Sequence, residues 1–261
     1  MEQLETRLAS GALTYFVEGE GRPLLYLHPA GGVRWTHVMR GLARSFKLYV
    51  PVAPGFDGTP PHAGLDSMKG LGALAGQFVE KIIGGPCDVM GCSFGGCAAM
   101  WLALQRPDLV DHLVLECPAG LEKRDPALRA DPEAFRRALF LYPEKMPPDS
   151  KPPELEGANR KMLPHYRSED GRDLKLMERL SEIDKMTLVL HGVLDRIVTK
   201  ESVQLLKSRL KRSFLIYFWD AAHGIEVDQP ERMLAVVREF LERSEAFVVN
   251  RGSLALNPFP R

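Results

Sequence analysis

The stretch 88–96 reads Asp-Val-Met-Gly-Cys-Ser-Phe-Gly-Gly, and it places Ser93 between glycines two residues before and two residues after it. A short apolar run, 88–92, precedes this serine, and a helical pattern follows at 94–105. A serine on such a tight strand-to-helix turn needs very small neighbours, and the turn pushes its hydroxyl out of the sheet. The five-residue pattern alone is a weak signal. Its position between a strand and a helix predicts that Ser93 is a nucleophile.

Short apolar runs alternate with helical patterns along most of the chain. The expected strands are 24–28, 48–52, 88–92, 113–117, 188–191 and 215–219, and the expected helices are 35–45, 71–83, 94–105, 202–210 and 230–242. Most of the strand runs are apolar on both faces, which is typical of strands that helices cover on each side. The alternation predicts an α/β fold with a mostly parallel, doubly wound sheet. Two earlier runs, 6–8 and 13–18, alternate in polarity and predict an antiparallel edge.

Residues 119–183 interrupt this alternation. They contain no convincing strand, several proline pairs, and helical patterns at 134–142 and 174–183. Because the region lies between two expected strands, we interpret it as an insertion into one domain. The predicted organisation is therefore a core, a helical insertion and a C-terminal extension, which cover 1–118 with 184–243, 119–183, and 244–261, respectively.

The C-terminal extension is richer in apolar residues than a disordered tail normally is. It holds Phe247, Leu254 and Leu256, for example. We expect it to pack on its own domain or on a second subunit, with a flexible terminus as the alternative. A homodimer is therefore one open prediction for the assembly.

The composition fits an ordinary globular protein and excludes several other classes. Lys plus Arg and Asp plus Glu number 34 each in 261 residues, so the formal net charge is zero. This balance gives no electrostatic reason to expect nucleic acid or an anionic membrane as partner. No stretch approaches the roughly 18 apolar residues that span a bilayer, and the N-terminus lacks a signal-peptide pattern. The four cysteines show no zinc-type spacing, so we expect reduced thiols, no metal, and a cytoplasmic location.

Two further residues follow expected strands and can complete a catalytic set with Ser93. Asp195 follows the strand 188–191, and His223 follows the strand 215–219. The carboxyl ends of parallel strands share one edge of a sheet, so residues distant in sequence can meet there. A nucleophilic serine needs a base that takes its proton and an anion that holds the imidazole in one tautomer. We predict His223 as the base and Asp195 as the acid that orients it.

Acyl transfer also needs backbone N–H groups that stabilise the oxyanion. Phe94 directly follows Ser93 and would supply one donor. The loop after the strand 24–28 reads His-Pro-Ala-Gly-Gly and would supply the second. Since Pro29 has no N–H group, Ala30 is the expected donor in that loop.

These motifs resemble those of the α/β-hydrolase superfamily over about residues 13–242. The matching pieces are HPAGG at 28–32, GCSFGG at 91–96, HGVLDRIV at 191–198 and AAHGIEVDQPE at 221–231. The resemblance implies the α/β-hydrolase fold, in which 119–183 is a helical cap that sets the shape of the substrate. Pro29 departs from the pattern, because the family usually has glycine there. Glu116 lies near an acid position that some members of the fold use, so it is the alternative to Asp195.

The expected activity is that of a carboxylesterase-like serine hydrolase on a small-molecule acyl substrate, without a metal or organic cofactor. CPAGL at 117–121 and HGVLDRIV at 191–198 are also similar to pieces of the hydrolases that cleave carbon–carbon bonds in ring-cleavage products. That reaction, a lyase or perhydrolase reaction on the same residues, and a non-catalytic binding protein are the alternatives. The sequence leaves the substrate open.

Overall fold

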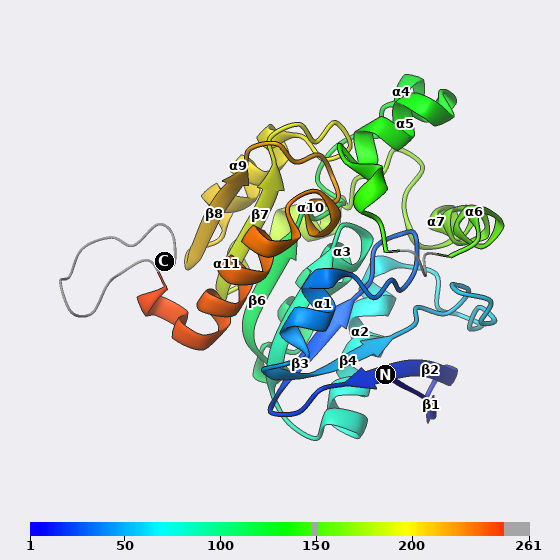
Figure 1. The fold of residues 1–261 in the computed structure, drawn as a ribbon. Helices are drawn as coiled ribbons and strands as arrows, with labels where there is room; N and C mark the ends of the chain where they lie inside the picture. Colours follow the sequence, from blue (N-terminus) through cyan, green and yellow to red (C-terminus); the bar gives the residue numbers. More distant parts are fainter. Residues whose placement is uncertain (148–150, 248–261) are drawn as a thin grey trace.

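The computed structural model describes residues 1–147 and 151–247, and one eight-stranded sheet forms its centre (Figure 1). The strand order is β1-β2-β4-β3-β5-β6-β7-β8. The strands are β1 (Glu2–Leu8), β2 (Gly11–Glu18), β3 (Arg22–Leu27), β4 (Phe46–Pro51), β5 (Cys87–Cys92), β6 (Val110–Glu116), β7 (Met186–Gly192) and β8 (Ser213–Phe218). β2 pairs antiparallel with β1 and β4, and the pairs from β4 through β8 are parallel. The predicted α/β fold with a mostly parallel sheet and an antiparallel edge is confirmed.

Helices cover both faces of this sheet, as the apolar strands require. On one side α1 (His37–Leu42) packs on α11 (Pro230–Arg243), and on the other α2 (Met68–Phe78) packs on α3 (Phe94–Gln105) (Figure 1). β5 is buried along its whole length, and so are most residues of α3. Each large apolar side chain that is fully removed from water here stabilises the fold by roughly 1.5–3 kcal/mol. The middle of the sheet is therefore a rigid support for the loops at its carboxyl edge.

The remaining elements of the core are shorter. They are the π-helix η1 (Val79–Ile83), the 3₁₀ helices η2 (Pro107–Leu109) and η5 (Ser244–Ala246), and the helices α9 (Lys200–Arg209) and α10 (Ile225–Asp228). The predicted helix 71–83 is wrong as a single α-helix, because α2 ends at Phe78 and η1 continues the chain to a left-handed Gly84. Glycine adopts that conformation without the steric cost of a Cβ.

The described chain between β6 and β7 contains helices joined by loops and no strand, and we call residues 119–183 the helical insertion. Its elements are α4 (Pro126–Ala130), α5 (Pro132–Leu139), η3 (Pro143–Lys145), α6 (Pro153–Lys161), α7 (Leu163–Tyr166), α8 (Leu174–Arg179) and η4 (Leu180–Glu182). Figure 1 shows α4 to α7 to one side of the sheet, beyond the helices that cover its two faces. Proline begins α4, α5 and α6, where its missing N–H costs nothing.

The predicted helix 134–142 is wrong at its carboxyl end. α5 stops at Leu139, and the Asp228 carboxylate of the core accepts hydrogen bonds from the backbone N–H groups of Leu141 and Tyr142, each at 2.9 Å. Those two N–H groups are thus satisfied by a side chain of the core instead of by helical carbonyls. A tertiary contact therefore ends the helix where the local pattern would continue it.

The C-terminal extension is described only as far as Phe247. The Phe247 ring is buried, with its centroid 5.5 Å from that of Phe214 and 5.6 Å from that of Phe240. The start of the extension thus packs on the core, while the prediction for 248–261 lies outside the described residues. Within the described ranges, no helix combines the length and apolar character needed to cross a membrane.

Candidate active site

Ser93 occupies the turn between β5 and α3 in a conformation that residues other than glycine rarely adopt. Its φ is +48° and its ψ is −106°. The surrounding backbone holds it there: its N–H donates to the Glu116 carbonyl at 2.8 Å, and its carbonyl accepts from the N–H groups of Cys97 and Ala119. Backbone strain of this kind costs on the order of 1–3 kcal/mol and persists only where the neighbouring structure fixes it. The tight turn predicted from the glycine spacing is present.

The glycines around Ser93 are needed because the turn packs closely against its surroundings. A Cβ on Gly91 would lie 2.5 Å from the Gly95 carbonyl oxygen. A Cβ on Gly95 would collide with the backbone of Leu27. The spacing that marks the motif in the sequence is therefore a steric requirement of this turn.

His223 and Asp195 meet at the carboxyl edge of the sheet, although 28 positions separate them in the chain. The His223 Nδ1 lies 2.8 Å from the Asp195 Oδ2. The other carboxylate oxygen of Asp195 accepts hydrogen bonds from the N–H groups of Ile197 at 2.7 Å and Val198 at 2.9 Å. The structure thus joins His223 to Asp195, while the alternative acid Glu116 accepts a hydrogen bond from the Glu226 N–H at 3.1 Å.

Each residue of this pair shifts the pKa of the other: Asp195 raises the pKa of His223, and His223 lowers the pKa of Asp195. Burial alone would lower the pKa of His223, but the charge and the hydrogen bond of Asp195 raise it above its ordinary value. Burial would raise the pKa of Asp195, but His223 and the two backbone N–H groups lower it below its ordinary value. Asp195 is therefore an ionised partner that stabilises the imidazolium form. Because Nδ1 faces Asp195, Nε2 is the ring nitrogen left for a reaction in the pocket.

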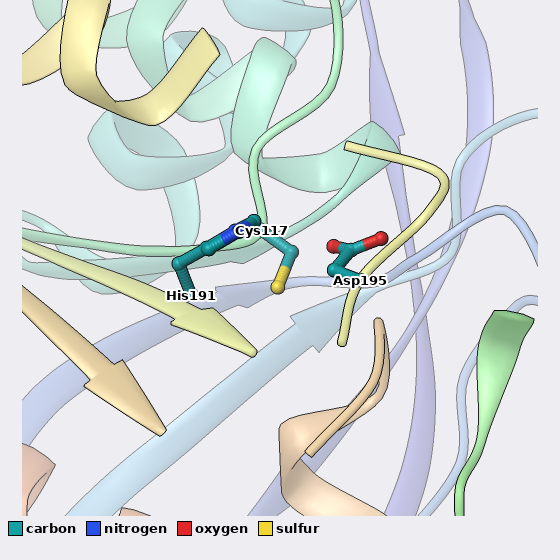
Figure 2. Close-up of side chains that lie close together, drawn as sticks. All are labelled: Cys117, His191 and Asp195. Atoms are coloured by element: carbon teal, nitrogen blue, oxygen red, sulfur yellow. The ribbon is translucent and has the colours of Figure 1, made fainter. Parts of the chain in front are cut away.

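Figure 2 shows Cys117 and His191 together on one side of Asp195. Their ligand atoms and those of Asp195 lie within 4.8 Å of one another, a spacing that would also suit a metal ion. Burial raises the pKa of the Cys117 thiol well above its ordinary value, and the Asp195 carboxylate raises it further. Thiolate is the form that binds metals, so we interpret this cluster as packing that supports Asp195.

Ser93 and His223 line the same pocket, which encloses about 230 Å³. The loop from Pro29 to Gly31 forms part of its wall, so the predicted donor Ala30 faces the same space. Phe94 begins α3 directly after Ser93, and its side chain is buried away from solvent. The helical insertion closes the pocket with apolar side chains, namely Leu128, Phe135, Leu139, Phe140 and Leu163. Ala30, Ser93 and His223 thus line one pocket, while Phe94 follows Ser93 on α3 and Asp195 lies behind His223.

A model of the alpha/beta hydrolase family matches residues 24–236, which is most of the chain. The chain belongs to the α/β-hydrolase family. Among curated proteins, this hydrolase is 25% identical over 251 residues to a pimeloyl-[acyl-carrier protein] methyl ester esterase of Aeromonas salmonicida, which covers 85% of this chain and 96% of the relative. It is 26% identical over 262 residues to the 2-hydroxymuconate semialdehyde hydrolase of Pseudomonas sp. strain CF600, which covers 89% and 91% of the two chains.

Solved structures share the fold of this hydrolase. The meta-cleavage product hydrolase from Pseudomonas fluorescens IP01 superimposes with a TM-score of 0.74, covering 88% of this chain and 94% of that one. The sequence identity is 21%, so this likeness shows the fold alone. The chain thus belongs to a family of hydrolases, and the fold explains why its residues meet at the carboxyl edge of the sheet.

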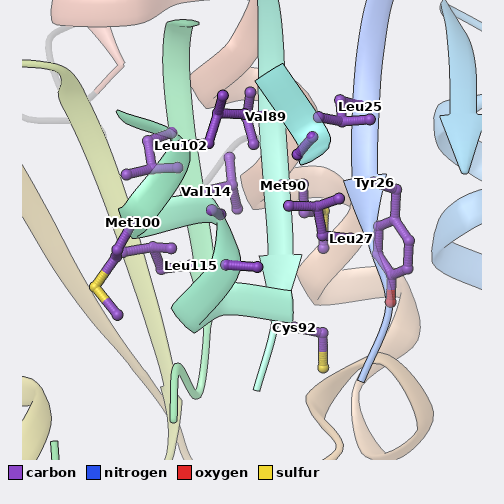
Figure 3. Close-up of a cluster of buried hydrophobic side chains, with 14 of the residues drawn as sticks. Leu25, Tyr26, Leu27, Val89, Met90, Cys92, Met100, Leu102, Val114 and Leu115 are labelled. Atoms are coloured by element: carbon purple, nitrogen blue, oxygen red, sulfur yellow. The ribbon is translucent and has the colours of Figure 1, made fainter. Parts of the chain in front are cut away.

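Sequence reasoning missed a buried acidic pair beneath the nucleophile of this hydrolase. Glu116 and Glu226 lie beside Cys92, the last residue of β5. Figure 3 shows Cys92 at the end of a cluster of buried apolar side chains from β3, β5 and β6. Burial raises the pKa of both carboxyls, and for Glu116 the nearby charge of Glu226 raises it further. Tyr26 donates a hydrogen bond to Glu226 at 3.1 Å. Glu116 thus serves in this cluster and not beside His223.

The sequence also gave no sign of the polar contacts between the helical insertion and the core. Asn159, on α6, is 1% exposed. Its side chain donates to the Gly31 carbonyl at 2.9 Å and to the Asp57 carboxylate at 2.7 Å, and it accepts from the Asp57 N–H at 2.8 Å. One asparagine of the insertion therefore fixes two loops of the core, one of which carries Ala30. A lone asparagine in a polar helix has no pattern that would mark it.

Proposed function

We propose that this hydrolase cleaves small carboxylic esters by two-step acyl transfer through Ser93. The observation that carries the proposal is that a strained serine and an imidazole held by a buried carboxylate line one pocket. A serine hydroxyl is a weak nucleophile until a positioned base removes its proton. His223 is the titratable residue of this pocket with an ionised acid, Asp195, on its far nitrogen.

In the first step, the Ser93 Oγ attacks the ester carbonyl carbon while His223 Nε2 takes the hydroxyl proton. The oxyanion is stabilised by the backbone N–H groups of Phe94 and Ala30, a contribution that is typically worth a few kcal/mol for each donor. The carbon–oxygen bond of the ester then breaks, and the leaving alcohol takes the proton from His223. This leaves an acyl group on Ser93.

In the second step, water attacks the acyl carbon and gives one proton to His223. The bond between the acyl carbon and Ser93 breaks, the serine oxygen recovers that proton, and the carboxylic acid leaves. Asp195 stays ionised and stabilises the imidazolium in both steps. We propose that the helical insertion acts as a cap, because its apolar side chains close the pocket against water.

A second candidate is hydrolysis of a carbon–carbon bond in a ring-cleavage product. It is favoured by the alignments with 2-hydroxymuconate semialdehyde hydrolase and with 2-hydroxy-6-oxo-2,4-heptadienoate hydrolase, at 26% and 27% identity. The reaction would use the same three side chains, Ser93, Asp195 and His223. The choice between the two substrates would therefore depend on the other residues that line the pocket.

A fluorophosphonate probe followed by a substrate panel tests the proposal. We expect the probe to label Ser93 in the native protein and to leave the Ser93→Ala variant unlabelled. Ser213, at the start of β8, is the matched control, since Ser213→Ala should still be labelled. The panel pairs p-nitrophenyl esters of increasing chain length with a ring-cleavage product. Labelling that survives Ser93→Ala, or cleavage of the ring-cleavage product alone, would overturn the esterase proposal.

A further inference from the structure

The pocket that holds Ser93 is lined by more basic than acidic side chains. The basic residues are Arg34, Lys123, Arg124, Arg160, Arg167 and Arg196, and the acidic ones are Glu122, Asp125 and Glu226. Burial raises the pKa of Glu122 to about 7 and also raises the pKa of Glu226. Glu122 is therefore only partly ionised near neutral pH and contributes less negative charge than an ordinary carboxylate. The chain as a whole has no net charge, so this excess is local to the pocket.

Two of these arginines share a single carboxylate. Arg34, from the core, and Arg160, from α6, each pair with a different oxygen of Glu156, the second at 3.2 Å. Burial lowers the pKa of Arg160, and the charge of Arg34 lowers it further against the opposing effect of Glu156. The two guanidinium groups therefore repel each other, and one carboxylate does not fully offset them. The nearby Asp57 carboxylate is already paired with Lys151, so it does not serve as a second anion for the two arginines.

The Arg34 guanidinium is buried and incompletely bonded. Its side chain is 8% exposed, and its Nε has no hydrogen-bond partner among the described residues. The Phe140 ring lies under it, 5.9 Å from centroid to Cζ. A buried cationic donor without a partner costs free energy. Arg34, which lines the pocket, therefore has one buried N–H donor without a partner among the described residues.

The position of Arg34 places this donor close to the reaction. A Cβ on Gly31 would lie 2.9 Å from an Arg34 Nη atom, so the guanidinium covers the residue next to Ala30. Guanidinium groups match carboxylates in shape and form charge-assisted hydrogen bonds with them. An acyl group that is attached to Ser93 and ends in a carboxylate could reach this wall without leaving the pocket.

We propose that the physiological substrate class is an ester whose acyl part ends in a carboxylate, a half-ester of a dicarboxylic acid, and that Arg34 and Arg160 bind that carboxylate. This inference rests on the proposed esterase function and adds the chemical class of its substrate. The anion supplies the second negative charge that the two guanidinium groups lack, and it accepts a hydrogen bond from the Arg34 Nε. Selectivity for the half-ester then depends on the boundary between the core and the helical insertion, because the core contributes Arg34 and the insertion contributes Arg160.

The test compares the monomethyl and dimethyl esters of the same dicarboxylic acids, with four to eight carbons in the acid. We expect the native enzyme to favour the half-ester in kcat/KM by roughly 10-fold to 100-fold, since a charge-assisted pair contributes about that factor. Arg34→Gln and Arg160→Gln should reduce this preference at least about ten-fold, mainly through KM of the half-ester. Arg137→Gln is the matched control, because Arg137 lies on α5 with an exposed side chain paired with Glu133 and should leave the preference unchanged.

A second variant covers the case in which Arg34→Gln destabilises the protein by leaving Glu156 with one partner. Arg160→Gln leaves the buried pair of Arg34 with Glu156 intact, so it should lose the preference without this destabilisation. The inference is overturned if the native enzyme has the same kcat/KM for the diester and the half-ester. It is also overturned if the variants lower kcat/KM equally for both esters. If neither ester is hydrolysed and the fluorophosphonate probe does not label Ser93, the proposed function itself is overturned, and the substrate class with it.

Discussion

The two walls of the pocket are built in different ways. On the core side, backbone hydrogen bonds fix Ser93 at its strained turn, and two backbone N–H groups fix Asp195. On the side of the helical insertion, many contacts with the core run through polar and charged side chains, above all Glu156 and Asn159, beside a backbone bond from the Gly224 N–H to the Leu139 carbonyl at 2.8 Å. Backbone hydrogen bonds do not depend on side-chain identity, so they hold Ser93 and Asp195 in positions that the reaction requires to stay constant. Contacts set by side chains suit a wall that can change its selectivity while the chemistry stays the same.

The largest expected effect is on the core wall. Ser93→Ala and His223→Ala should each lower ester turnover by on the order of 10³-fold or more without unfolding the chain. The two losses should not multiply in the double variant, since both residues act in the same step. Steady-state kinetics with circular dichroism as the folding control measures this. Full activity in Asp195→Asn together with loss in Glu116→Gln would show that the acid is assigned to the wrong residue.

The next effect lies at the boundary between the two walls. Asn159→Leu should leave the Gly31 carbonyl and the Asp57 N–H without partners, which we expect to cost about 2–4 kcal/mol of unfolding free energy. Turnover should also fall, by about 10-fold to 100-fold, because the loop that carries Ala30 loses a support. Urea denaturation and kcat measure the two effects. Lys161→Gln, an exposed change on the same helix, is the control. A native kcat in Asn159→Leu would contradict the prediction that this contact between the insertion and the core supports catalysis.

A smaller effect concerns the pH dependence of kcat/KM. His223 must be neutral to accept the serine proton, and its pKa is raised chiefly by Asp195 against the effect of burial. Activity should therefore fall on acidification at a higher pH than for an ordinary histidine. Glu122 also raises the pKa of His223, so Glu122→Gln should move the acidic limb of the profile to lower pH. The exposed Glu182→Gln should not move it, and a shift in the opposite direction for Glu122→Gln would contradict this electrostatic account.

The smallest effect on catalysis is expected at the far end of the core. Phe247→Ala removes a buried ring that packs on Phe214 and Phe240, and it should lower the unfolding free energy by about 3 kcal/mol or more. Because the ring packs on Phe214 at the amino end of β8, whereas the pocket lies at the carboxyl edge of the sheet, kcat/KM below the melting transition should stay native. Thermal denaturation with parallel kinetics tests this, and a loss of activity without a loss of stability would contradict it.

The core wall was predictable from the sequence, because its signals are local. Strand runs mark the sheet, and the glycines around Ser93 mark a turn that only small residues permit. Asp195 and His223 could be paired because the carboxyl ends of parallel strands share an edge. Their predicted meeting corresponds to the observed hydrogen bond.

The other wall depends on contacts between distant parts of the chain. Arg34 and Glu156 are 122 positions apart, and each has the pattern of an ordinary surface charge in its own segment. Likewise, α5 ends at Leu139 because Asp228 binds the amides that follow, which no local pattern indicates. Side chains that pair across an insertion leave no periodicity, so their partners appear only in the folded chain.

The most direct test of the account is to trap the acyl group on the enzyme. A p-nitrophenyl ester is mixed rapidly with the native protein, the reaction is quenched in acid, and the digested peptides are analysed by mass spectrometry. We expect a burst of about one p-nitrophenol per chain and an acyl adduct on Ser93, both absent in Ser93→Ala. Steady hydrolysis with no adduct on Ser93, and undiminished in Ser93→Ala, would contradict it.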